Sequence, residues 1–222
     1  MLSAIACALG LAPATEPVPA EPAAAVVPAA ATITRDELLA ALRAVPGVHA
    51  RYREEQHIAL LAAPLVSEGT MHFAPPDRLA KHQRKPARAR TVVAGGRLRF
   101  ADAFGHDEVD LASNPVVALF VHSVLHVLAG DVARIEATWA VGFSGGADGE
   151  PRAWVLALRP ITSPATELVE SIVLRGREAR VERIEVRELG GDRTVTTLSD
   201  IDTAHRYEGD ELTRVFSVDA GE

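Results

Sequence analysis

Cysteine, aromatic residues and positive charge are all scarce in this chain of 222 residues. Cys7 is the single cysteine, so neither an internal disulfide nor a cysteine-based metal site can form. Six Phe, two Tyr and two Trp leave a core that must be mostly aliphatic, although 48% of the residues are hydrophobic. Lys and Arg number 23 against 30 Asp and Glu, and the net charge of −7 disfavours nucleic-acid binding. The length fits one globular domain.

Residues 1–31 differ in composition from the rest of the chain. They hold twelve Ala, five Pro and no Lys or Arg. The short apolar run Ile5–Leu11, followed by Ala12-Pro13-Ala14, is typical of a secretory signal with a small-residue cleavage site. We therefore predict export to the periplasm, with a signal peptide and an Ala/Pro-rich linker over 1–31 and one domain over 32–222. Because a positive n-region is missing, an alternative is a start further upstream, which would make Cys7 a lipid-modified N-terminus.

The domain is predicted to begin with a short amphipathic helix. Thr34 and Glu37 form a capping box, apolar residues follow at helical spacing, and Pro46-Gly47 ends the helix. Further along, residues 65–73 alternate with period 2, so that Leu65, Met71 and Phe73 share one face. This alternation predicts a half-buried antiparallel strand.

Glycine turns divide most of the remaining chain into hairpins. They stand at Gly95-Gly96, Gly145-Gly146, Arg175-Gly176-Arg177 and Gly190-Gly191. Consecutive hairpins make an antiparallel meander, and about eleven strands are more than a flat sheet holds without curling. We predict a mainly β fold with helices (α+β), in which a strongly curved antiparallel sheet or unclosed β-barrel of about 11 strands carries a helical lid.

One segment in mid-chain breaks the strand pattern. Asn114 can cap a helix, Pro115 suits the first helical position, and Gly130 ends the run. Between them only His122, Ser123 and His126 are polar, so the helix needs apolar neighbours on two sides. Its length of roughly 22 Å, at about 1.5 Å per residue, is too short to cross a bilayer. We predict a lid or plug on the curved sheet.

These features occur in an order that carries a resemblance. The relevant segments are Ser67-Glu68-Gly69-Thr70-Met71-His72-Phe73-Ala74-Pro75-Pro76, Val92-Val93-Ala94-Gly95-Gly96-Arg97-Leu98 and Gly190-Gly191-Asp192-Arg193-Thr194. Together with an exported N-terminus, an amphipathic first helix and an apolar mid-chain helix, they resemble the LolA family of periplasmic lipoprotein carriers over residues 33–218.

The resemblance implies an unclosed β-barrel whose apolar concave face, covered by helices, holds the acyl chains of a lipoprotein or lipid-like cargo and shuttles it toward the outer membrane. It also implies a non-enzymatic monomer without cofactor or metal, whose partners are the acylated cargo, an inner-membrane transporter and an outer-membrane acceptor. Two alternatives remain open, a lipid-sensing regulatory module and a membrane-tethered lipoprotein acceptor. The carriers resembled have an Arg before the Pro that follows the second strand, and this Arg hydrogen-bonds the lid. Here that position is Pro75, which has no side-chain donor.

Cargo contacts are expected on the apolar concave face and on the lid. The strand residues predicted there are Met71, Phe73, Leu79, Phe100, Trp139, Val141, Phe143, Trp154 and Leu156. The lid residues are Val117, Phe120, Val121, Val124 and Leu128. Because any curved sheet has an apolar inner face, about half of the strand residues are expected to be ordinary core.

Other groups in the sequence have simpler interpretations. His122 and His126 share a helical face as two metal ligands would, but no third ligand is indicated, which favours a polar stripe. Ser123 lies between them without the flanking glycines of a nucleophile elbow. Arg84, Lys85, Arg88 and Arg90 form a basic cluster near one hairpin. A solvated sheet edge is its simplest interpretation, and a docking patch for a partner or anionic headgroups is the alternative.

Overall fold

Alternating apolar and polar residues build one antiparallel sheet in the computed structural model, which describes residues 31–218. The predicted signal peptide and Cys7 lie outside the described residues. The described part forms an 11-stranded sheet in the order β6-β5-β4-β3-β2-β1-β11-β10-β9-β8-β7. The strands are β1 Val48–His57, β2 Leu65–Ala74, β3 Arg78–Lys85, β4 Ala89–Ala94, β5 Arg97–Asp102, β6 Gly105–Asp110, β7 Trp139–Gly145, β8 Ala153–Pro160, β9 Val169–Arg177, β10 Arg180–Glu188 and β11 Arg193–Asp202.

The sheet is not closed, because β6 and β7 are its two edges and do not pair with each other. Strands adjacent in sequence are mostly adjacent in the sheet, and β1 pairs with β11 to join the two halves. This arrangement confirms the prediction of a curved, unclosed antiparallel sheet of eleven strands with helices.

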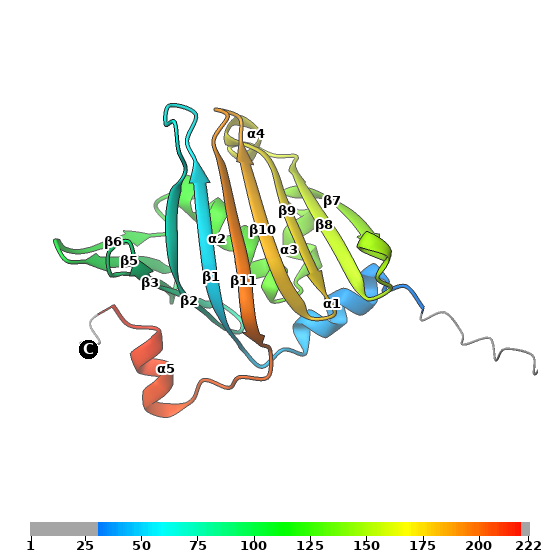
Figure 1. Cartoon of the computed structure of the whole chain (residues 1–222), viewed down its shortest axis with the longest axis horizontal. Helices are drawn as coiled ribbons and strands as arrows, with labels where there is room; N and C mark the ends of the chain where they lie inside the picture. The colour runs from blue at the N-terminus through cyan, green and yellow to red at the C-terminus, as the bar shows by residue number, and fades with distance from the viewer. Residues whose placement is uncertain (1–30, 219–222) are drawn as a thin grey trace, which may run out of the picture. The chain divides into compact units, whose positions relative to one another are not determined.

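Helices lie mainly on one face of the sheet. Among the described residues they are α1 Arg35–Arg43, α2 Pro115–Leu128, α3 Val132–Glu136, α4 Ala165–Leu168, α5 Gly209–Val215 and the short 3-10 helix η1 Ala147–Gly149. In the chain α2 and α3 connect the edge strand β6 to the edge strand β7, and Figure 1 shows them behind the sheet. We call this covered face the inner face. No helix among residues 31–218 is long and apolar enough to span a membrane.

The helix boundaries follow the caps expected from the sequence. The Thr34 hydroxyl accepts from the Glu37 backbone N–H, and the Glu37 carboxylate accepts from the Thr34 N–H, so the predicted capping box is confirmed. The side chain of Asn114 accepts from the Val117 N–H at 3.1 Å, and Pro115 is the first residue of α2.

Two separate cores result from the alternation of side chains across the strands. The larger one lies on the inner face, between the sheet and α1, α2 and α3, and includes Leu38, Leu125 and Trp154. A smaller core lies on the outer face, where Ala74, Ala80 and Val92 pack with Tyr207, Val215 and Phe216. The C-terminal segment with α5 therefore covers part of the outer face of β2, β3 and β4, which the sequence analysis did not anticipate (Figure 1).

One predicted turn is wrong. Gly176 was expected in a turn, but it lies inside β9 and pairs with Val181, while the turn falls at Glu178 and Ala179. A Cβ at Gly176 would come within 2.0 Å of the Arg180 carbonyl oxygen and 2.7 Å of the Trp154 ring. The glycine is required by close packing, so its presence was a poor turn signal.

Candidate functional site

An apolar cavity lies on the inner face between the sheet and the helices. Strands β1, β2, β10 and β11 form its floor, α1 and α2 contribute Leu42 and Leu128, and Val45 comes from the segment after α1. The remaining lining residues are Val48, Ala50, Met71, Phe73, Ala179, Val181, Ile184, Leu198, Ile201 and Thr203. Thr203 is the only one of the lining residues with a polar side chain.

The cavity has a volume of about 20 Å³, roughly the room that one water molecule needs. The apolar concave face that the resemblance implies is therefore filled in this conformation and leaves no room for an acyl chain. The reason is that the helix side chains Leu42 and Leu128, together with the buried Leu38 and Leu125, fill the inner face. This is a closed arrangement of the helices on the sheet.

A polar cluster follows the cavity along β1. Val48 and Ala50 line the cavity, and the next inner-face residues are Tyr52 and Glu54. The Lys81 ammonium lies 2.6 Å from Glu54 Oε1 and 4.7 Å from the centre of the Tyr52 ring. The Thr196 hydroxyl donates to Glu54 Oε2 at 2.9 Å. Glu54 is 8% exposed and the side chain of Lys81 is 23% exposed, so a largely buried charged pair lies on a mostly apolar face.

The Tyr52 hydroxyl is the least satisfied group of this cluster. Tyr52 is 3% exposed, and burial raises its pKa to about 12, against a smaller lowering by the nearby Ser67 side chain. The Ser67 hydroxyl does not meet hydrogen-bond geometry with it, and no other described residue supplies a partner. A buried hydroxyl without a partner is uncommon in native proteins.

The predicted cargo contacts are distributed unevenly around the inner face. Met71, Phe73 and Leu128 line the cavity. The other buried or half-buried strand residues of the prediction belong to the surrounding core: Leu79, Trp139, Val141, Phe143, Trp154 and Leu156. Phe100 lies opposite Thr91, which lies opposite Lys81, so all three are on the inner face. Phe100 is nevertheless 41% exposed, because β5 extends beyond the helices.

The lid residues form a half-buried stripe on α2. Val117, Phe120, Val121 and Val124 all pack against the inner core while remaining partly accessible, whereas Leu125, Val127 and Leu128 near the end of α2 are buried. The stripe thus offers apolar surface that is incompletely covered.

Two arginines of α1 connect the helices to one another. Arg43 Nε donates to the Gly130 carbonyl, just after α2, at 3.0 Å. Arg35 pairs with Glu136 at the end of α3. We call these two contacts the helix latches. Pro75 has no side-chain donor that could hold a lid, and among the described residues the helices are tied through α1.

The polar residues of α2 do not line the cavity and make contacts within the helix. His122 is exposed and its ring stacks on His126 at 5.6 Å, and the Ser123 hydroxyl donates to the Leu119 carbonyl at 2.6 Å. Burial, and secondarily His122 and Arg134, lower the pKa of His126. Within residues 31–218 no set of three His, Cys, Asp or Glu side chains could hold a metal ion.

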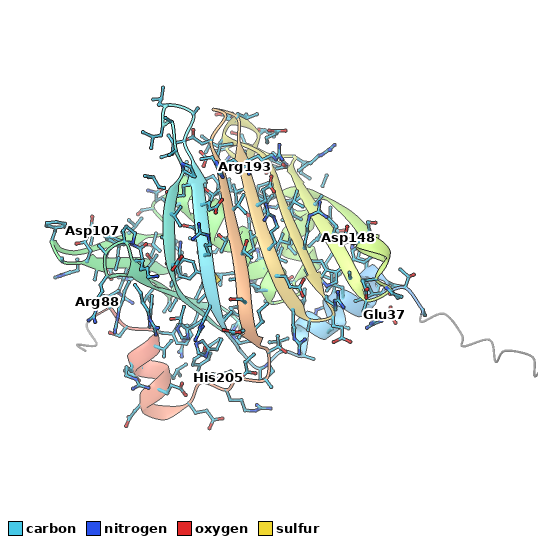
Figure 2. The ribbon with its side chains drawn as sticks, viewed as in Figure 1. Glu37, Arg88, Asp107, Asp148, Arg193 and His205 are labelled. Atoms are coloured by element: carbon cyan, nitrogen blue, oxygen red, sulfur yellow. The ribbon has the colours of Figure 1, made fainter. Side chains whose placement is uncertain are left out.

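The end of the sheet toward the β1–β2 loop carries exposed apolar residues. We call this loop, residues 58–64, the rim loop, and it contains no charged or polar side chain. Leu60 is 94% exposed, and Leu61 and the adjoining Leu65 are also exposed. The Ala59 N–H donates to Asp192 at 2.9 Å, which ties the rim loop to the turn before β11, where Figure 2 places Arg193.

The basic cluster lies around β3 and β4, away from the cavity. Lys85 pairs with Glu68 at 3.0 Å, and Arg90 donates to the Ser217 carbonyl at 3.4 Å. Arg84, Arg88 and Arg90 line an open depression of about 820 Å³. A docking role for this surface stays a prediction.

Sequence reasoning missed the cavity residues on β1, β10 and β11. Val48, Ala50, Ile184 and Leu198 occur in charge-rich segments, where the apolar side chains are small or isolated. Their period-2 alternation was the available signal. The prediction named residues of β2, β3, β5, β7 and β8 instead, and most of these pack in the core around the cavity.

Comparison with known proteins agrees with this architecture. The model of the family described as outer membrane lipoprotein carrier protein LolA-like matches residues 26–215. The chain belongs to the outer membrane lipoprotein carrier LolA-like family. No curated protein matches it.

Several solved structures are similar to the chain. A LolA superfamily protein from Nitrosomonas europaea is 13% identical, with a TM-score of 0.44 over 85% of this chain and 99% of that chain. MucB in its complex with MucA from Pseudomonas aeruginosa is 14% identical, with a TM-score of 0.45 over 80% of this chain and 58% of that chain. A DUF1329 family protein from Desulfovibrio piger is 10% identical, with a TM-score of 0.43 over 76% and 91% of the two chains.

Proposed function

We propose that the protein is a non-enzymatic carrier of the periplasm, which binds the acyl chains of a lipoprotein or lipid-like cargo on its inner face and delivers them toward the outer membrane. The observation that carries the proposal is the composition of the inner-face cavity, in which twelve apolar residues and one threonine surround the space between the sheet and the helices. Membership of the LolA-like family supports the same function.

Binding requires an exchange of apolar contacts. An acyl chain of about 16 carbons gains roughly 13 kcal/mol on leaving water, at about 0.8 kcal/mol per methylene. A bilayer offers a similar gain, so a carrier must replace it with an equally apolar environment. When α2 leaves the sheet, the acyl chain takes over the contacts of the half-buried stripe and of Leu128, which limits the cost of opening.

The rim loop supports contact with a lipid surface. It is exposed, and its seven residues carry no charge to oppose contact with acyl chains or headgroups. The same loop favours a second candidate function, a membrane-tethered lipoprotein acceptor. The intact mass of the mature N-terminus separates the two, because an acylated Cys7 identifies the tethered acceptor.

Native mass spectrometry of the full chain, purified from its own periplasm without detergent, tests the proposal. We expect an adduct with the mass of an acylated species in the wild-type protein. Replacing Phe120 and Val124 by Asp puts two charges on the stripe, which should remove the adduct while the circular dichroism stays unchanged.

The matched control is Val116→Asp, on the same helix at an exposed position, which should keep the adduct. Retention of the adduct by the Phe120→Asp, Val124→Asp double variant would exclude α2 from the binding site. Absence of any adduct from the wild-type protein, together with failure to bind added acyl lipid, would refute the proposed function.

A further inference from the structure

The polar cluster on the inner face calls for an explanation that packing does not give. Replacing a buried ion pair by apolar residues of similar size is often neutral or stabilising, so the Glu54–Lys81 pair is weakly explained by stability alone. A buried phenol without a partner lowers the stability of the protein that carries it, because its hydroxyl has lost water without gaining another contact. Both features stand beside the apolar cavity, on the same face of β1.

We propose that this cluster binds the polar end of the cargo, with Tyr52 and Lys81 donating hydrogen bonds to the carbonyl oxygen of an acyl ester or acyl amide. The inference rests on the proposed function, since it assumes that acyl chains occupy the inner face. It adds the chemical class of the headgroup linkage and the residues that recognise it.

The order of residues along β1 sets the orientation of the cargo. Ala50 lines the cavity and Glu54 lies four residues further on, roughly 13 Å away at about 3.3 Å per residue. An acyl chain that lies along β1 in the opened cavity can therefore reach the level of Tyr52 and Glu54 with its carbonyl end, where the only polar partners beside the cavity's floor on β1 are found among the described residues. Beyond them, His57 of β1 lies opposite Arg193 of β11 in the strand register, at the end of the sheet that carries the rim loop. The headgroup therefore points toward the rim loop.

The charges of the cluster select a neutral linkage. An ammonium group has three N–H donors, and the contact with Glu54 Oε1 uses one of them. The Tyr52 hydroxyl has its proton to donate, because a phenol is protonated at neutral pH and burial raises the pKa of Tyr52 further above its ordinary value of 10. Glu54 already balances the charge of Lys81, so a free fatty-acid carboxylate would meet a second carboxylate at close range. An ester or amide carbonyl accepts the same hydrogen bonds without that repulsion.

Two probes that differ only in the carbonyl group test the inference. Palmitoylglycerol contains the ester carbonyl, and hexadecylglycerol ether has the same glycerol headgroup and a sixteen-carbon chain without it. Dissociation constants are measured by displacement of an apolar fluorescent dye below the micellar concentration. We expect the wild-type protein to bind the ester about three- to tenfold more tightly, the effect of one or two net hydrogen bonds.

Tyr52→Phe should reduce this preference, because only the Lys81 donor remains, without weakening binding of the ether. Its melting temperature should be unchanged or higher, because the unpartnered hydroxyl is removed. The control Tyr207→Phe makes the same change on the outer face and should keep the preference, with its fold checked by circular dichroism.

Equal binding of both probes by the wild-type protein, or a preference as large in Tyr52→Phe as in the wild-type protein, would overturn the inference and leave the carrier function standing. Failure of the wild-type protein to bind either probe would instead refute the proposed function, and the inference with it.

Discussion

At the scale of single residues, His72 on the outer face of β2 is the most perturbed titratable group. Its ring lies between His49 and His82, with centroid distances of 4.8 Å to each. Its two nitrogens are within 3.0 Å of the Tyr207 hydroxyl and 2.9 Å of the Thr70 hydroxyl. Burial, followed by the charges of His82, His49, His205 and Arg84, lowers the pKa of His72 to about 3. Figure 2 shows His205 near the bottom of the view, below the strands of the sheet.

Acid should therefore destabilise the protein through His72. Its pKa falls from 6.5 in the unfolded chain to about 3 in the folded protein, so the unfolded chain binds more protons between these values. Its contribution to the free energy of unfolding is present above pH 6.5 and is lost as the pH falls toward 3. We expect a loss of roughly 2 kcal/mol from this residue between pH 7.5 and pH 5, measured by urea unfolding.

His72→Gln should flatten this pH dependence, whereas His106→Gln, at an exposed position on β6, should leave it as in the wild-type protein. Parallel pH profiles for His72→Gln and the wild-type protein would contradict the assignment. Burial also lowers the pKa of His82, which contributes in the same direction.

The sequence predicts local backbone conformation better than it predicts which distant residues come into contact. The Thr34–Glu37 box and the Asn114 cap were predictable because each involves residues three apart in the chain. The role of Gly176 was not, since it depends on the approach of Arg180 and Trp154. The ion pair of Glu54 and Lys81 was equally invisible, because 27 residues separate its partners and the sheet register brings them together.

At the scale of elements, the helix latches set how firmly α2 is held in the closed arrangement. The Arg43 contact reaches the Gly130 carbonyl, and Gly130 has a φ of +64°, a left-handed conformation suited to glycine. A Cβ at this position would come within 2.6 Å of the Leu39 carbonyl oxygen. The end of α2 is therefore packed tightly on α1, and opening must break this contact or carry α1 along.

Arg43→Met should favour opening. The substitution keeps an apolar stem and removes a hydrogen bond worth about 0.5–1.5 kcal/mol to the closed state. Opening then costs less free energy, because the closed state has lost this hydrogen bond. The apparent affinity for palmitoylglycerol should therefore rise by roughly two- to tenfold. Dye displacement measures the change.

Arg134→Met is the control, because Arg134 lies on α3 and pairs only locally, with Asp131 at 3.3 Å. Its affinity for palmitoylglycerol should match that of the wild-type protein. An unchanged or weaker affinity in Arg43→Met would show that the latch does not govern opening.

Elements with strong local signals were predicted well, and α5 was missed for a physical reason. α2 has a capping side chain, a proline at its first position and a continuous apolar run. α5 spans only Gly209–Val215 and has no side-chain cap. It is held by the packing of Val215 and Phe216 against the outer face, and that contact depends on the folded sheet.

At the scale of the whole molecule, one sheet separates two different environments. The inner face carries a mostly aliphatic core, with the polar cluster of Tyr52, Glu54 and Lys81 beside it. The outer face carries His49, His72 and His82, next to the C-terminal segment. The curvature and the open edges were predictable from the number of hairpins. The filled interior was not, because the seating of α1 and α2 depends on side-chain packing across the barrel.

The most direct measurement of where an acyl chain binds is photo-crosslinking with a palmitoylglycerol that carries a diazirine at the end of its chain, followed by peptide mapping. If the inner face takes up acyl chains by displacement of α2, the adducts fall on cavity residues such as Met71, Leu128 and Ile184. Adducts confined to the rim loop or to the outer face under α5 would contradict binding inside the barrel.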